Sequence, residues 1–197
     1  MAGDDNKDIG LRERKRRETL ARITETGVSL FLSKGYDSTT LEMVAEAAGI
    51  SRRTFFYYFK SKEEIILAWQ SNFTSLIREA ILAQPSDIPP LAVVENALRH
   101  LVIGFDPKQS IALDSVLRKN ETLRAARNAK YIAQEQAVFE ALCEKWPQPK
   151  RRNSLRFVAM LSIGAFRLAI DAWSEDNGRR PPLHHLREAF ASLRHAL

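Results

Sequence analysis

The sequence predicts an all-α protein with about nine helices. Apolar residues recur at steps of three and four along most of the 197 residues, which is the period of an amphipathic helix. No stretch shows the alternation of a strand, and valine and isoleucine are scattered rather than clustered. The hydrophobic fraction of 45% is enough for a real core. We therefore expect one compact helical body, or such a body with a small domain attached.

The first helix is expected from residue 11 to residue 34, after a frayed arm over residues 1–10. Gly35 follows the last periodic position and has the character of a C-cap. The inward positions of this helix recur at helical spacing and are Leu20, Ile23, Gly27, Leu30 and Phe31. Gly27 costs about 1 kcal/mol of helix propensity relative to alanine, for which the sequence offers no reason.

Two short helices follow, joined by a tight turn. Thr40 is a suitable N-cap for a helix over residues 41–48, and Ser51 for another over residues 52–59. Gly49 lies between them, where the backbone must bend in a way that a Cβ atom would oppose. A helix, a glycine-containing turn and a second helix make the helix-turn-helix arrangement.

The rest of the chain is predicted to be a larger set of helices. Pro89 and Pro90 end one of them, because proline cannot continue a helix. The expected helices cover residues 62–83, 91–105, 108–118, 121–146, 152–174 and 183–197.

Composition and motifs exclude several classes of protein. No apolar run is long enough to span a membrane, and the polar start does not resemble a signal peptide. The single cysteine, Cys143, cannot form an internal disulfide and is expected to be a buried thiol. No two glycines are closer than seven residues, so nucleotide-binding glycine motifs are absent, and no metal-binding motif occurs. His184 and His185 are adjacent on a helix and point to different faces. We expect no enzyme, no cofactor and no metal.

The net charge is +6, and residues 1–62 and 63–197 each contribute +3. The distribution is more informative, because Arg14, Lys15 and Arg17 belong to a basic run within the first helix. Such a run is typical of a polyanion-binding surface but also of an ordinary solvated helix face. A membrane-surface role is a further possibility, although it leaves the ordered pattern of the next two helices unexplained.

The aromatic and basic stretch at residues 51–64 divides into two roles. Phe55 and Phe59 are four residues apart and are expected to pack in a small core. Arg52 and Arg53 lie at the start of the second short helix, where a guanidinium can bind guanine O6 and N7 or clamp phosphates. Tyr57 is expected on the same outward side. The alternative for these outward residues is a solvated helix face.

The segment TTLEMVAEAAGISRRTFFYYFKSKEEII resembles the DNA-binding signature of the TetR family of bacterial transcriptional regulators. The matching positions extend from Ile23 to Glu63, about a quarter of the chain. Arg53 replaces a common glycine and Phe56 a common tyrosine, which should alter base preference and remove one phosphate contact. The DNA-binding residues implied by the pattern and the resemblance are Arg14, Lys15, Arg17, Thr40, Ser51, Arg52, Arg53, Thr54, Phe56, Tyr57, Tyr58 and Lys62.

The resemblance implies a helix-turn-helix DNA-binding domain over residues 11–61 and a ligand-binding and dimerisation domain over residues 62–197. A two-fold partner is also expected because one helix-turn-helix covers too few base pairs to be selective. An apolar stripe on the last helix and small residues on the one before predict the dimer interface, namely Phe157, Gly164, Leu168, Leu186, Phe190, Leu193 and Leu197. The alternative is that these residues cover the core of their own chain.

The resemblance further implies an effector pocket between the helices after residue 62. Its candidate residues are Trp69, Phe73, His100, Phe105, Leu117, Arg118, Tyr131, Phe139, Met160, Phe166 and Arg167. Aromatic walls suggest an apolar or flat small molecule, although plain core packing is the ordinary role of each residue.

We therefore expect a cytoplasmic, ligand-responsive regulator, in the family's usual mode a repressor, that binds a palindromic DNA operator as a homodimer and uses no membrane or cofactor. The alternative is an all-α dimeric binding or adaptor protein without sequence-specific DNA binding.

Overall fold

The computed structural model describes residues 4–104, 113, 117 and 121–196, and these residues contain no strand. The prediction of an all-α protein is confirmed. The expected helix over 108–118 lies outside the described residues, apart from two buried leucines at 113 and 117. The helices are α1 (Asp4–Lys34), α2 (Leu41–Ala47), α3 (Arg52–Tyr58), α4 (Lys62–Ala83), α5 (Pro90–Ile103), α7 (Glu121–Lys145), α8 (Arg152–Glu175) and α9 (Pro182–Ala196), with a short 3₁₀ helix, Pro149–Arg151, before α8.

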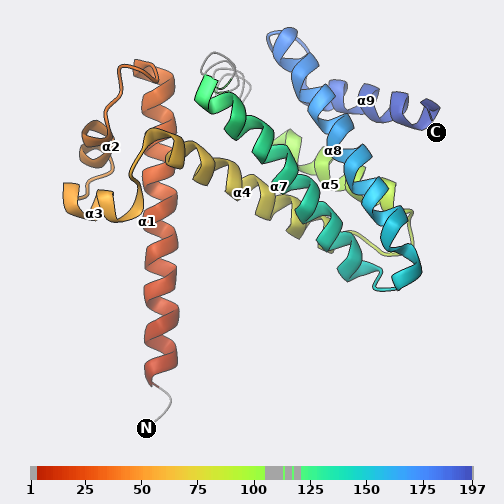
Figure 1. Cartoon of the computed structure of the whole chain (residues 1–197), viewed down its shortest axis with the longest axis horizontal. Coiled ribbons are helices and arrows are strands. Elements are labelled where there is room, and N and C mark those ends of the chain that lie inside the picture. The colour runs from red at the N-terminus through yellow and green to blue at the C-terminus, as the bar shows by residue number, and fades with distance from the viewer. Residues whose placement is uncertain (1–3, 105–112, 114–116, 118–120, 197) are drawn as a thin grey trace. The chain divides into compact units, whose positions relative to one another are not determined.

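The first helix is longer than its hydrophobic pattern indicates. We expected a frayed arm over residues 1–10, whereas α1 begins at Asp4 (Figure 1). No proline occurs before residue 11, and each residue added to an existing helix contributes one more backbone hydrogen bond. The hydrophobic pattern marks only the part of the helix that packs, so it missed the extension.

The chain divides into two compact units, one ending at Gln70 and the other beginning at Ser71. The N-terminal unit contains α1, α2, α3 and the first turns of α4. Its core is formed by apolar side chains that are almost fully buried, namely Ile23, Val28, Phe31, Val44, Phe55, Phe59, Ile65 and Ile66. The first turns of α4 therefore pack with the short helices, although the predicted domain boundary was at residue 61.

Gly27 has a structural role in this core. A Cβ atom at position 27 would lie 2.8 Å from Cγ2 of Ile65 and 3.5 Å from Cγ1 of Val44. Glycine therefore lets α4 approach α1 more closely than alanine would allow. This close approach explains a residue that is otherwise unfavourable within a helix.

The C-terminal unit is a helical bundle in which α8 packs against α5, α7 and α9. Figure 1 shows α7 and α8 running side by side over much of their length. Pro90 occupies the first turn of α5, where the missing N–H costs no hydrogen bond. The helix α9 is also tied to α5 by an ion pair between Arg194 and the nearly buried carboxylate of Glu95.

No helix within the described residues is long and apolar enough to cross a membrane.

Candidate nucleic-acid interface

The two short helices of the N-terminal unit are capped as the sequence predicts. The hydroxyl Oγ1 of Thr40 accepts a hydrogen bond of 3.2 Å from the backbone N–H of Met43. Ser51 Oγ accepts from the N–H of Thr54 at 3.1 Å. Gly49 has φ of +65°, the left-handed conformation that favours glycine. The helix-turn-helix geometry of α2 and α3 is therefore set by local chemistry.

The inner face of α3 attaches this helix to the unit. Phe55 is fully buried and Phe59 is 3% exposed, with their ring centroids 6.1 Å apart. Phe56 is half-buried and meets the ring of Phe55 edge to face. The core role predicted for Phe55 and Phe59 is confirmed.

The outer face of α3 presents basic and aromatic side chains to solvent. Arg52, Arg53 and Thr54 are exposed, and Tyr57 is 76% exposed, which is unusual for a side chain of its size. Tyr58 is half-buried, with its ring edge to face against Tyr57. A rigid short helix thus carries two guanidinium groups and a phenol outward, the groups that bind base edges and phosphates.

Arg52 and Arg53 differ in their surroundings. Nη2 of Arg52 lies 2.8 Å from Oε1 of Glu42 on α2, and its guanidinium lies 5.5 Å from the ring centroid of Phe56. Within the described residues, Arg53 has no ion pair. The role of Glu42 was missed because the sequence pattern does not reveal which acid a surface arginine contacts.

Lys62, predicted to bind phosphate, is engaged within the chain. Its Nζ donates a hydrogen bond of 2.7 Å to the backbone carbonyl of Tyr36 and lies 4.3 Å from the centroid of that ring. An ammonium has three N–H donors, so this bond leaves others for a phosphate. Lys62 thus joins the start of α4 to the loop before α2.

Tyr36 makes a second link to α4 that the sequence pattern did not indicate. Its hydroxyl donates a hydrogen bond of 2.7 Å to Oε1 of Glu63. This hydrogen bond lowers the pKa of the Glu63 carboxyl below its usual value. Burial, together with the bond to Glu63, raises the pKa of Tyr36. Both shifts favour the neutral phenol next to an ionised carboxylate.

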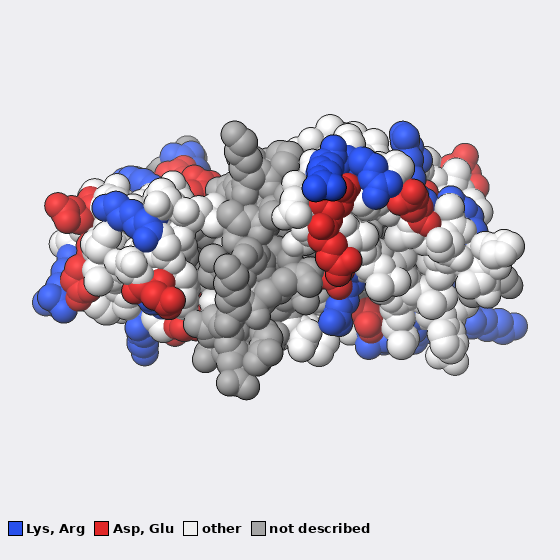
Figure 2. All heavy atoms as spheres, turned by 90° about the horizontal axis from the view of Figure 1, so that it is seen from above, with Lys and Arg blue, Asp and Glu red and all other residues white. Residues whose placement is uncertain are grey.

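The basic run on α1 is exposed but partly paired. Arg14 lies 3.5 Å from Glu18 along the helix, whereas Lys15 and Arg17 have no ion pair within the described residues. Figure 2 shows basic and acidic side chains interspersed on the visible face rather than gathered in one basic patch. The exposed basic side chains predicted to bind DNA thus lie on α1 and α3.

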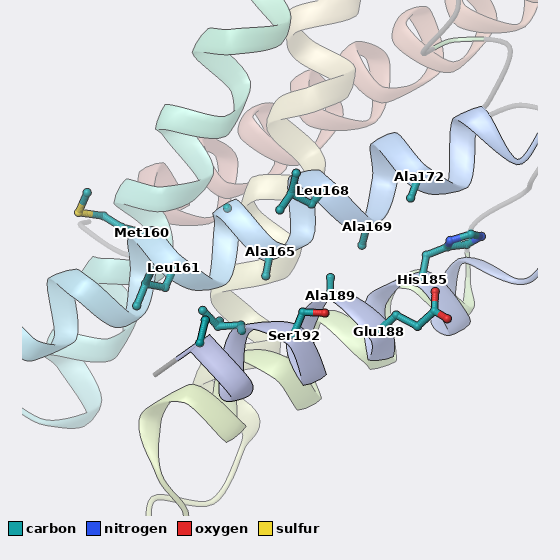
Figure 3. Close-up of a pocket in the computed structure, with 13 residues that line it drawn as sticks. Met160, Leu161, Ala165, Leu168, Ala169, Ala172, His185, Glu188, Ala189 and Ser192 are labelled. Atoms are coloured by element: carbon teal, nitrogen blue, oxygen red, sulfur yellow. The ribbon is translucent and has the colours of Figure 1, made fainter.

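A second surface lies on the C-terminal unit, where α8 and α9 enclose an open groove lined by small and apolar residues. Figure 3 shows Ala169 of α8 and Ala189 of α9 pointing toward one another across it. Leu168, which lines the groove, is 67% exposed. Phe157, also on α8 but outside the groove, is 64% exposed. Large apolar side chains exposed together on one helix are typical of a protein interface.

The residues predicted to form the dimer interface differ in their exposure. Gly164 is exposed along with Phe157 and Leu168, and Leu193 is half-buried. Leu186 and Phe190 are buried in the core of their own chain, so the prediction that they form the interface is wrong. They lie on the face of α9 that packs toward α5 and α8. Leu197 lies outside the described residues.

The predicted pocket residues also fall into different environments. Phe73 and Phe166 stack with ring centroids 5.7 Å apart, and Phe166, Leu117, Tyr131 and Phe139 are buried. Three predicted pocket residues are exposed and do not line the core, namely His100, Met160 and Arg167. Met160 lines the α8–α9 groove instead. The guanidinium of Arg167 lies 5.4 Å from the centroid of the Tyr131 ring. Trp69 belongs to the N-terminal unit, and Phe105 and Arg118 lie outside the described residues.

Two polar residues in the core of the C-terminal unit were not anticipated. Gln134 on α7 is 1% exposed and Ser162 on α8 is fully buried. Gln134 Oε1 and Ser162 Oγ have no hydrogen-bond partner within the part of the chain that is described. A search for hydrophobic periodicity passes over both residues because it considers only apolar side chains.

Comparisons with known proteins agree with the helix-turn-helix. A family model described as bacterial regulatory proteins, tetR family, matches residues 23–69. The regulator TcmR of Streptomyces glaucescens is 39% identical over 90 residues, covering 46% of this chain and 40% of that protein. RutR of Escherichia coli K12 is 30% identical over 93 residues, covering 47% of this chain and 44% of that protein. The chain thus aligns with less than half of the length of these two relatives.

Solved structures extend the likeness to the whole fold. FadR of Thermus thermophilus, a TetR family repressor solved with lauroyl-CoA, has a TM-score of 0.60 at 24% identity and covers 88% of this chain and 92% of its own. FadR of Bacillus halodurans has a TM-score of 0.63 at 17% identity, with coverages of 89% and 94%. The helical architecture of both units is therefore that of these regulators. Residues 23–69, which contain the capped α2–α3 pair, thus match the tetR family of bacterial regulatory proteins.

Proposed function

We propose that the protein is a ligand-responsive, DNA-binding transcriptional regulator that acts as a homodimer on a palindromic operator, in the usual mode of a repressor. The observation that carries this proposal is the outward face of α3, where Arg52, Arg53 and Tyr57 are exposed over a buried pair of phenylalanines. The buried face fixes the helix, so the exposed face is presented in one orientation.

The DNA contacts are assigned by their chemistry. Arg52, Arg53, Phe56 and Tyr57 face base edges, where arginine binds guanine and an apolar ring contacts the thymine methyl group. Backbone phosphates are contacted by hydroxyl and cationic groups, namely Arg14, Lys15, Arg17, Thr40, Ser51, Thr54, Tyr58 and Lys62. The hydroxyl oxygens of Thr40 and Ser51 accept hydrogen bonds as helix caps, which leaves the O–H of Thr40 to donate to a phosphate. Ser51 and Thr54 share a hydroxyl hydrogen bond of 2.8 Å, so one O–H of that pair remains for a phosphate.

The α8–α9 surface supports the homodimer. Phe157 and Leu168 are large apolar residues left exposed, and Gly164 between them permits close approach of a second helix. The groove has a volume of about 560 Å³, which also falls within the range of small-molecule sites. The exposed Phe157 favours a protein partner, since it does not line the groove and a small ligand there would leave it in water.

The core of the C-terminal unit supports an effector. The stacked rings of Phe73 and Phe166 and the buried acceptors of Gln134 and Ser162 fit a largely apolar or aromatic molecule that carries a hydrogen-bond donor. No resident cofactor is proposed, and we place the protein in the cytoplasm, where its DNA target lies. The relatives are named as regulators, which supports a role other than catalysis.

The test is selection of bound duplexes from a random pool by the full chain. We expect an enriched motif of two inverted half-sites whose centres are separated by about one helical turn, or a multiple of it, of 10–10.5 base pairs. The adaptor alternative predicts no enrichment, together with an intact dimer in solution. An enriched single half-site with no symmetry would contradict the homodimer but not DNA binding.

A further inference from the structure

The ion pair between Glu42 and Arg52 joins the two helices of the helix-turn-helix on their outer side. Glu42 is the second residue of α2 and Arg52 the first residue of α3, and Oε1 and Nη2 are 2.8 Å apart. The side chains are 47% and 71% exposed. An ion pair this exposed contributes little to stability, because water screens the two charges. Stability is therefore a weak explanation for an acid at this position.

The pair fixes a guanidinium on the proposed DNA-contacting face. Arg52 is held by Glu42 at Nη2 and also lies over the ring of Phe56, 5.5 Å from its centroid. A guanidinium has five N–H donors in a planar fork, so one bond to a carboxylate leaves others for the O6 and N7 atoms of guanine. An arginine loses side-chain rotamer entropy when it is immobilised. Here part of that loss occurs before DNA binds.

The carboxylate of Glu42 also weakens the attraction of Arg52 to the phosphates of DNA. Non-specific affinity for DNA comes from neutralisation of phosphates by cations. An arginine paired with an acid contributes little net charge to that attraction, and the acid itself repels the backbone. Arg53 has no such partner within the described residues and keeps its full charge. The two adjacent arginines are therefore suited to different tasks.

We propose that Glu42 is a specificity-determining residue that positions Arg52 for a base edge and suppresses its binding to phosphate. This inference rests on the proposed DNA-binding function. In this proposal, the base selectivity of Arg52, the first residue of α3, depends on Glu42 of α2, a helix that does not itself contact the bases.

The experiment compares Glu42→Gln with wild type on the selected operator and on a random duplex of equal length, in full-length protein. We expect the affinity for the random duplex to rise about fivefold while operator affinity changes less than about twofold, so that the selectivity ratio falls. Melting temperature should stay unchanged because the pair is exposed. Glu46→Gln is the matched control, since Glu46 is exposed on the same helix and its loss changes the charge equally. It should shift both affinities by one common factor.

A second arm places Glu42→Gln in an Arg52→Ala background. There the substitution should leave the selectivity ratio unchanged, because the effect passes through Arg52. The inference is overturned if Glu42→Gln keeps the wild-type ratio, if Glu46→Gln lowers the ratio equally, or if the effect persists without Arg52. Failure of the wild type to discriminate between the two duplexes would instead overturn the proposed function.

Discussion

The two units of the chain differ in the hydrogen bonding of their buried polar side chains and in their exposed apolar side chains. In the N-terminal unit, buried polar side chains are bonded: Thr39 Oγ1 donates to the carbonyl of Gly35 at 2.8 Å, and Tyr36 donates to Glu63. In the C-terminal unit, Gln134 and Ser162 are buried with acceptors unpaired in the described part of the chain.

Apolar surface shows the same contrast. In the N-terminal unit the exposed ring of Tyr57 carries a hydroxyl, and the purely apolar Leu67 is 44% exposed. In the C-terminal unit Phe157 and Leu168 carry no polar group and are 64% and 67% exposed. An unpaired buried acceptor and an exposed apolar side chain are both costly in isolation. Within the described residues, the unpaired buried side-chain atoms and the most exposed purely apolar side chains therefore lie in the C-terminal unit.

The largest expected effect is a difference between two substitutions, one on the buried face of α9 and one on the exposed face of α8. Phe190→Asp places an unpaired charge in the core and should prevent stable folding, at a cost of about 3–5 kcal/mol or more. Leu168→Asp alters an exposed side chain and should leave the monomer folded while weakening the dimer. Light scattering and circular dichroism distinguish the two outcomes. An intact dimer in Leu168→Asp would place the interface elsewhere.

A comparable loss is expected inside the helix-turn-helix. Phe55→Ala empties the centre of the small core and should lower the stability of the N-terminal unit by about 3–5 kcal/mol. Tyr57→Ala removes a ring of similar size from the opposite side of α3 and should change stability by less than about 0.5 kcal/mol. Denaturant titration measures both. Equal costs for the two substitutions would contradict the division of α3 into a core face and a contact face.

Two substitutions with smaller effects test the contrast in buried polar groups, because they should change the free energy of unfolding in opposite directions. Ser162→Ala removes an unpaired buried hydroxyl, so the free energy of unfolding should rise by about 1 kcal/mol. Thr39→Val removes a buried hydroxyl that is bonded to backbone carbonyls, so stability should fall by about 1 kcal/mol. A loss of stability in Ser162→Ala would show that the hydroxyl already has a partner in the free protein.

The smallest effect is a pH dependence at the start of α4. The hydrogen bond from Tyr36 lowers the pKa of the Glu63 carboxyl in the folded protein below the reference value of 4.5. The bond therefore stabilises the folded state fully above pH 4.5, and this stabilisation is lost as the pH falls through the folded-state pKa. Tyr36→Phe should reduce stability at pH 7 by about 0.5 kcal/mol, a small figure because solvent screens the pair. The difference from wild type should shrink below pH 4.5. A constant difference across that range would exclude the linkage.

The helix-turn-helix could be predicted nearly residue by residue because its determinants are local. Thr40, Gly49 and Ser51 act on their own turns, and the spacing of Phe55 and Phe59 fixes the buried face. What escaped prediction there depends on contacts distant in sequence. The pairing of Glu42 with Arg52, and that of Tyr36 with Glu63, is decided only when the helices pack.

The C-terminal unit was predictable as a set of helices but not in its surfaces. The spacing on α9 marks an apolar stripe, yet the same stripe can face a partner or the chain's own core. Leu186 and Phe190 proved to face the core, whereas Phe157 and Leu168 on α8 are exposed. Buried polar residues such as Gln134 are invisible to a hydrophobic pattern, because burial of a polar side chain depends on the tertiary packing around it.

The central claim is that α3 reads base sequence through its exposed arginines. The most direct test measures the affinity of wild type, Arg52→Ala and Arg53→Ala for the selected operator and for variants substituted at each base pair of one half-site. We expect unchanged melting temperatures and, for Arg52→Ala, a loss of about 1–3 kcal/mol of discrimination at one definable position. If both variants discriminated as the wild type does at every position, α3 would not read DNA through these residues and the account would be wrong.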